Sequence, residues 1–192
     1  TNMSHMFSGC SGLTGIDLSP LNTANVTNMS YMFKSCSKLT ELNLAPLDTK
    51  NVTNMRNMFD SCEKLNNLNT TQLNTSRVTD MSGMFYKCIS FSNLDLSNFD
   101  TSAVIEMGGL SRYEGASGFA SFGQDGMFED CSSLTSLIIP FDTSHVTNFG
   151  KMFKSCKALN TLDITTFDTS AAKNMSSMFD GCESLMNIDL SK

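Results

Sequence analysis

The chain has 192 residues, 40% of them hydrophobic, and a formal net charge of −6 from 13 basic and 19 acidic residues. This is enough apolar material for a folded core. The basic residues form no cluster, which argues against nucleic-acid binding and against docking on anionic lipid. No apolar run approaches the roughly 20 residues of a membrane helix, so we expect no membrane insertion by this segment.

The seven cysteines mark an internal repeat. They stand at positions 10, 36, 62, 88, 131, 156 and 182, at intervals of 26, 26, 26, 43, 25 and 26 residues. Other apolar positions recur with them, including phenylalanine three residues before every cysteine. A period of this length is typical of repeat proteins whose units stack on one another. The sequence therefore predicts about seven units of 26 residues.

The first half of each unit predicts a short amphipathic helix. In the third unit the apolar residues follow one another at steps of 3, 3, 1, 3 and 3. These residues are Val52, Met55, Met58, Phe59, Cys62 and Leu65. At about 100° per residue they lie within an arc of roughly 140°. Asp48 and Thr49 precede them and are residue types that cap a helix start or form Asx turns.

The second half of each unit predicts a short strand. Leu42 and Leu44 alternate with polar residues, as in a strand with one buried face. One helix and one strand cannot bury their apolar faces alone, so the units must share a continuous core. We therefore expect an α/β solenoid of the leucine-rich-repeat type, a single repeat domain over residues 1–192. Its strands form one parallel sheet, and its helices line the opposite side.

The motif M-x-x-M-F-x-x-C has two interpretations. Methionine and cysteine sulfurs select Cu(I), so a copper column is conceivable. Phe149 replaces one supposed ligand, however, and methionine and free cysteine pack well in cores. We therefore predict a structural core ladder, no metal site and no cofactor. This ladder includes Cys36, Cys62, Cys88, Met58, Phe59, Met84, Phe85, Met152 and Phe153.

Disulfides and a polar ladder are further alternatives. An odd number of cysteines in one apolar column favours free thiols over disulfides between coils. The column of aspartate and threonine residues could form a calcium ladder or a hydroxyl face for glycans or water. Turn formation is the favoured interpretation, because Asp, Asn and Thr are common turn residues. The threonines of this column are Thr23, Thr49, Thr75, Thr101, Thr143 and Thr169.

One segment interrupts the repeat. Met107 and Met127 are twenty residues apart instead of three, so 17 extra residues lie within 108–126, in the fifth unit. Insertions in solenoids emerge as loops on one face, and such loops are either functional or without a role. Charged and aromatic groups typical of recognition surfaces make this loop the best binding candidate. They are Arg112, Tyr113, Glu114, Phe119 and Phe122.

The repeat resembles a known family. The frame L-x-x-L-x-L, followed by [LF]-[DN]-T-x-x-V-T-x-M-x-x-M-F-x-x-C, is seen here as LTELNLAPLDTKNVTNMRNMFDSC and is similar to the BspA-like leucine-rich repeats of bacterial surface proteins and lipoproteins. The resemblance covers nearly the whole chain. It implies a curved solenoid that is secreted or displayed on a bacterial cell surface as an adhesin, and it transfers no catalytic residues. Thr70, Ala172 and a unit one residue short after Cys131 depart from the frame.

We therefore expect a non-enzymatic module that binds an extracellular protein or glycan, such as one on a host surface, by the loop or by the repeated face. The alternative is a structural spacer that holds another domain away from the cell. His5 and His145 are isolated and complete no catalytic constellation. Both ends interrupt a unit, so we expect a fragment of a longer protein with flanking domains or repeats, or else end-to-end pairing of the fragment.

Overall fold

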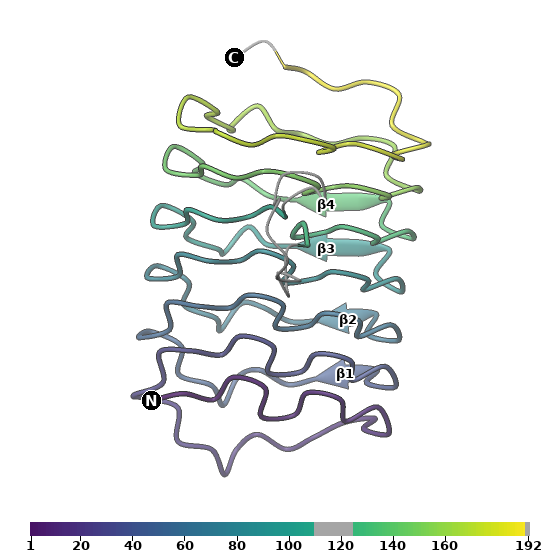
Figure 1. Ribbon diagram of the computed structural model, residues 1–192. Coiled ribbons are helices and arrows are strands. Elements are labelled where there is room, and N and C mark those ends of the chain that lie inside the picture. The colour runs from purple at the N-terminus through teal and green to yellow at the C-terminus, as the bar shows by residue number, and fades with distance from the viewer. Residues whose placement is uncertain (110–124, 191–192) are drawn as a thin grey trace, which may run out of the picture.

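A computed structural model describes residues 1–109 and 125–190, which wind into a stack of coils (Figure 1). We number the coils 1 to 7 by the cysteine that each contains. The two termini lie at opposite ends of the stack. Parallel bridges connect equivalent residues of successive coils along its length, and these residues are Asn2, Asn28, Asn54, Asp80, Glu106, Asn148 and Asn174. The predicted repeat solenoid is confirmed.

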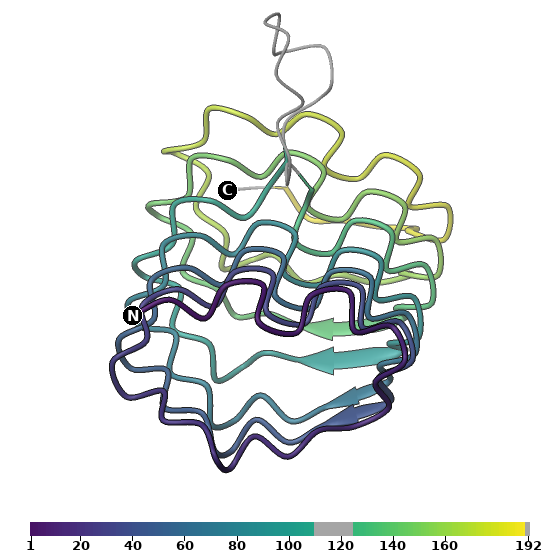
Figure 2. The same cartoon turned by 60° about the horizontal axis from the view of Figure 1, so that its bottom comes forward.

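Four short strands lie on one side of the stack (Figure 2). They are β1 (Glu41–Leu42), β2 (Asn67–Leu68), β3 (Asn93–Asp95) and β4 (Ser136–Ile138). Strand β1 pairs in parallel with β2, and β3 with β4. Leu42 lies opposite Leu68, and Leu94 opposite Leu137. These leucines are buried, so each strand has one core face and one solvent face.

The prediction of one continuous parallel sheet is wrong. The described residues form two separate two-stranded sheets and, farther along, an isolated bridge between Thr161 and Asn187. Strands β1, β2 and β3 are short because an Asx turn bends the chain at or directly after the end of each of them. The Asp95 carboxylate, for example, accepts the N–H of Ser97 at 2.9 Å.

The predicted helices are also wrong, because the described residues contain no helix. In coil 2 every second backbone N–H, from Met29 to Ser35, donates to a carbonyl of coil 3. Groups bonded to the next coil cannot form the bonds four residues back that build an α-helix. Between them, the N–H groups of Met32 and Lys34 donate three residues back, as Met32 does to Met29 at 3.3 Å, and so close β-turns, whereas that of Ser30 donates to the side chain of Asn28.

These turns explain why the sequence resembles a helix. Each β-turn advances the chain by three residues, so the apolar steps of three that predict an amphipathic helix arise from successive turns. The backbone φ of Tyr31 is +60° and that of Ser35 is +59°, which belongs to the left-handed region and not to a helix. The six apolar residues from Val52 to Leu65 are nevertheless fully buried, so the pattern identifies the core face correctly.

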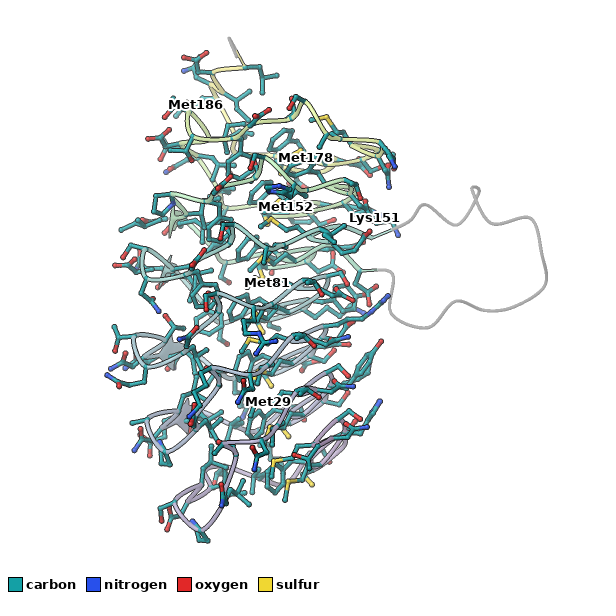
Figure 3. The ribbon with its side chains drawn as sticks, turned by 90° about the vertical axis from the view of Figure 1, so that its left-hand side faces the viewer. Met29, Met81, Lys151, Met152, Met178 and Met186 are labelled. Carbon is teal, nitrogen blue, oxygen red and sulfur yellow. The ribbon has the colours of Figure 1, made fainter. Side chains whose placement is uncertain are left out.

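Columns of side chains from successive coils form the core. The phenylalanine rings stack along the solenoid, with centroids 5.4 to 5.9 Å apart. They belong to Phe7, Phe33, Phe59, Phe85, Phe128, Phe153 and Phe179. Methionines from two repeated positions follow the same axis, as Met29 and Met81 of one position and Met152 and Met178 of the other show in Figure 3. The nine residues of the predicted core ladder have no exposed surface.

Candidate functional site

The two residues that flank the insertion form the same β-turn hydrogen bond as the equivalent residues of coils without an insertion. The N–H of Met127 donates to the carbonyl of Met107 at 2.9 Å, just as Met58 donates to Met55 at 3.2 Å in coil 3. The insertion therefore replaces the two central residues of a β-turn. The predicted binding residues Arg112, Tyr113, Glu114, Phe119 and Phe122 lie outside the described part of the chain.

Glycines allow the ends of the insertion to approach the next coil. A Cβ atom on Gly108 would lie 2.2 Å from the backbone nitrogen of Gly150, and one on Gly126 would lie 2.0 Å from the carbonyl oxygen of Lys151. Both contacts are with backbone and cannot be relieved by a side-chain rotation. The two glycines therefore fix where the chain leaves and rejoins coil 5.

Asp125 connects the returning end of the insertion to coil 3. Its Oδ2 accepts a hydrogen bond of 3.3 Å from Nδ2 of Asn57, 68 residues away in the sequence. Asn57 is fully buried. Coil 4 carries Gly83 beside it, where a Cβ atom would lie only 2.4 Å from the Asn57 nitrogen. The absence of a side chain at Gly83 thus provides the space for the amide of Asn57.

A second carboxylate shares the same amide group. Nδ2 of Asn57 also donates to Oδ2 of Asp60 at 3.1 Å, and Asp60 forms an ion pair with Lys34 of coil 2. The Asp60 side chain is 1% exposed. Burial raises the pKa of the Asp125 carboxyl above its usual range, and the charge of Asp60 adds to this effect. Two carboxylates therefore share one amide nitrogen, and the positive charges of Lys34 and Lys151 only partly offset the rise in the pKa of Asp125.

Glu129 contacts the point where the chain rejoins coil 5 after the insertion. Its Oε2 accepts the N–H of Gly126 at 3.0 Å, and its Oε1 lies 3.6 Å from Nζ of Lys154. Burial raises the pKa of this carboxyl, although the bond from Gly126 and the positive charges of Lys151 and Lys154 act in the opposite direction. Lys151 lies on the outer edge of the stack, away from the strands (Figure 3).

A polar groove of about 380 Å³ lies beside Gly108. Arg56 and Lys173 contribute positive charge to it, and Glu106 contributes negative charge. The Arg56 guanidinium lies 3.7 Å from Asp80, and the Asn148 amide donates to Glu106 at 2.9 Å. The lining residues are Arg56, Ser82, Glu106, Gly108, Thr147, Asn148, Lys173 and Asn174. The groove thus adds hydrogen-bonding groups to the surface beside the insertion.

The threonine column is structural and does not form a hydroxyl face. The described geometry buries five of its six members, all except the half-buried Thr169. The Thr143 hydroxyl donates to the carbonyl of Asp168 in the next coil at 2.9 Å and accepts the N–H of the same residue at 2.7 Å. The aspartates form Asx turns, as Asp142 does with the N–H of Ser144 at 3.0 Å. The turn interpretation of the column is therefore confirmed.

The cysteine column consists of free thiols. From coil 2 onward each thiol donates to the phenylalanine carbonyl of the preceding coil, as Cys62 does to Phe33 at 3.2 Å. Burial raises the pKa of Cys36 to about 11 and that of Cys131 to about 12, so these thiols are protonated at neutral pH. Within the described residues, no three His, Cys, Asp or Glu side chains gather to hold a metal.

A family model described as "Mycoplasma protein of unknown function, DUF285" matches residues 1–121 and 123–192. The chain belongs to the DUF285 family. No curated protein matches its sequence.

Solved structures of bacterial leucine-rich repeat proteins are similar to this DUF285 chain. A leucine-rich repeat protein of T. pallidum is 20% identical with a TM-score of 0.56, and the match covers 97% of this chain and 71% of that one. A leucine-rich repeat protein from Eubacterium ventriosum is also 20% identical, with a TM-score of 0.48, over 86% of this chain and 42% of that one. The first likeness supports a leucine-rich-repeat type of solenoid.

The histidines of the DUF285 chain lie in different surroundings. The His5 ring stacks on Tyr31 with centroids 4.5 Å apart. Nδ1 of His145 lies 3.2 Å from the Ser144 hydroxyl, which donates to Asp142 at 2.7 Å. In a catalytic triad histidine stands between the acid and the serine, and here serine stands between the acid and histidine.

Among the described residues, no helix is long and apolar enough to cross a membrane.

Proposed function

We propose that this chain is a non-enzymatic binding module that presents the 108–126 insertion to an extracellular protein or glycan. The observation that carries this proposal is the closed base of the insertion. The hydrogen bond between Met127 and Met107 keeps the coils in register. Hydrogen bonds of Asp125 and Glu129 hold the segment that follows the insertion. A segment held at its base by a rigid scaffold loses less conformational freedom on binding.

The bacterial surface is the proposed location. The BspA-like frame in the sequence and the similarity to bacterial leucine-rich repeat proteins support display on the cell or secretion, with adhesion as the role. We propose flanking domains or repeats as the means of attachment. The spacer role is the second candidate, because the bridge ladder from Asn2 to Asn174 makes a continuous stack suited to holding another domain at a distance.

A binding screen tests the proposal. The chain is compared with a variant in which residues 108–126 are replaced by Ser-Gly, the pair that stands between Met81 and Met84 in coil 4. The matched control is Ile138→Asn, which changes the solvent face of β4 to the residue type found at Asn43 and Asn69. The panel contains extracellular-matrix proteins, glycans and intact cells.

Loss of binding in the Ser-Gly variant, with binding kept in Ile138→Asn, is the expected result. The reverse pattern would move the site to the strand face and overturn the proposal for the insertion. If neither the chain nor Ile138→Asn binds while both remain folded, the spacer role becomes the better account.

A further inference from the structure

We propose that the groove beside Gly108 binds an acidic sugar, whose carboxylate is recognised by the guanidinium group of Arg56 and the ammonium group of Lys173. Apart from Gly108, the residues that line this groove lie outside the insertion. The ligand is thus narrowed from the glycan of the proposed function, on which this step rests, to one that carries a carboxylate. The groove volume of about 380 Å³ is at the small end of the range for ligand pockets, so it suits one or two sugar units.

Arg56 has hydrogen-bonding capacity to spare. Its Nη1 lies 3.7 Å from Oδ2 of Asp80, which is too long for a hydrogen bond. The other oxygen of Asp80 already accepts the N–H of Ser82 at 2.9 Å and the hydroxyl of Ser82 at 2.6 Å. Nε of Arg56 is buried and has no hydrogen-bond partner among the described residues, which is uncommon for a buried donor. A guanidinium group of this kind can bind a carboxylate through two parallel hydrogen bonds.

The negative charge of the groove is already engaged. Glu106 is the one acid among the eight described residues that line it. Its Oε2 accepts the amide of Asn148 at 2.9 Å, and its Oε1 lies 3.5 Å from the hydroxyl of Thr147. Lys173 is exposed and forms no ion pair within the described part of the chain. Two positive groups therefore remain for an anionic ligand.

The remaining lining groups fit a sugar better than a peptide. The eight described lining residues include no apolar side chain, whereas protein partners are usually anchored by aromatic or other large side chains in pockets. Ser82 and Thr147 contribute hydroxyl groups, and Glu106 contributes carboxylate oxygens. Sugar hydroxyls can both donate to and accept from such groups, so the groove matches a small, polar, hydroxyl-rich ligand.

Both positive residues depart from the repeat. Arg56 stands where coils 2 and 4 carry Ser30 and Ser82, and Lys173 stands where coil 6 carries Thr147. The coils therefore fold with serine and threonine at these positions. Arg56→Ser and Lys173→Thr consequently remove each charge while restoring the residue type of a neighbouring coil.

NMR titration of the whole chain with glucuronate, and separately with glucose and with acetate, tests this site. We expect a Kd on the order of 1 mM for glucuronate, with shifts centred on the amides of Gly108, Thr147 and Lys173. Glucose lacks the carboxylate and acetate lacks the hydroxyls, so both should bind more weakly. Arg56→Ser should weaken glucuronate binding by about tenfold or more, and Lys173→Thr by about two- to fivefold, because its ammonium group is exposed. The matched control Lys157→Ser removes an exposed lysine outside the groove and should leave binding unchanged.

Equal affinities for glucuronate and glucose would overturn the inference, as would an unchanged glucuronate affinity in a folded Arg56→Ser variant or shifts centred away from the groove. Acetate that binds as tightly as glucuronate would show a general anion site and would overturn the assignment to a sugar. A negative titration leaves the proposed function intact if the screening panel still yields a ligand that the Ser-Gly replacement loses. A negative panel, conversely, leaves a positive titration of the groove intact.

Discussion

The rings of Phe85 and Phe128 stack with their centroids 5.8 Å apart, although the whole insertion separates them in the chain. This separation lies within the range found between neighbouring coils without an insertion, such as the 5.7 Å between Phe59 and Phe85 and the 5.9 Å between Phe33 and Phe59. The aromatic column therefore continues through coil 5 unchanged. A scaffold of this kind can present a long segment without adjusting its own packing.

The phenylalanine column should carry much of the stability. Phe59→Ala removes a fully buried ring that stacks on both neighbours, and we expect a loss of about 3–5 kcal/mol in the free energy of unfolding. Phe179→Ala is the matched control, because that ring is partly buried and stacks within the described chain on Phe153 alone. Urea titrations measure both variants, and equal losses would contradict the column as described.

Thiol reactivity should distinguish Cys10 from the rest of its column. Cys10 is exposed, whereas the cysteines of coils 2 to 6 are buried and their pKa values are raised by that burial. We expect one thiol to react rapidly with a maleimide at pH 8, the half-buried Cys182 to react slowly, and the other five to react only after unfolding. Rapid modification of several thiols in the native protein would show that the coils open readily.

The helix prediction failed for a physical reason. Leu39, Cys36 and Phe33 follow one another at steps of three, which sequence patterns alone assign to a helix face, while the structure places β-turn hydrogen bonds at these steps. The decisive bonds join residues about 25 positions apart, so a local pattern does not contain them. The inward direction of these side chains, by contrast, requires only the apolar period and was predicted correctly.

The short unit after Cys131 gives a second example. In coil 2 the N–H of Leu47 donates three residues back to Leu44, but in the short unit the N–H of Phe141 donates only two residues back to Ile139, at 2.7 Å. A γ-turn thus replaces a β-turn and absorbs the missing residue. The sequence locates the deletion without showing how it is accommodated.

The contact of Asn57 with Asp125 was likewise beyond prediction. The only signal in the sequence is that Asn57 and Gly83 stand at the position that Tyr31 occupies in coil 2.

The Asx turns should make stability depend on acid pH. The hydroxyl and the N–H of Ser102 lower the pKa of Asp100, and the N–H and hydroxyl of Ser144 lower that of Asp142. A carboxyl whose pKa is depressed in the folded state stabilises the protein above its unfolded pKa, and this contribution is lost as the pH falls through the folded value. Stability should therefore fall below about pH 4.

Replacement of both aspartates by asparagine isolates this effect. Asparagine keeps the acceptor oxygen and occurs naturally in the same column at Asn22 and Asn74. Urea titrations from pH 5 to pH 2 should show a smaller loss of stability in the double variant. Asp125 and Glu129, whose raised pKa values favour folding at low pH, are present in both proteins and cancel in the comparison. An unchanged pH dependence would contradict the role assigned to these turns.

The independence of the scaffold from the insertion is tested most directly by hydrogen exchange on the Ser-Gly replacement of residues 108–126. The N–H of Phe85 donates to Met127 and that of Met127 donates to Met107 in the present structure. We predict that both amides remain as protected in the replacement as in the full chain, and that urea unfolds the seven coils in one transition. Loss of protection at these amides, or separate unfolding of coils 1–4 and 5–7, would show that the insertion holds the solenoid together.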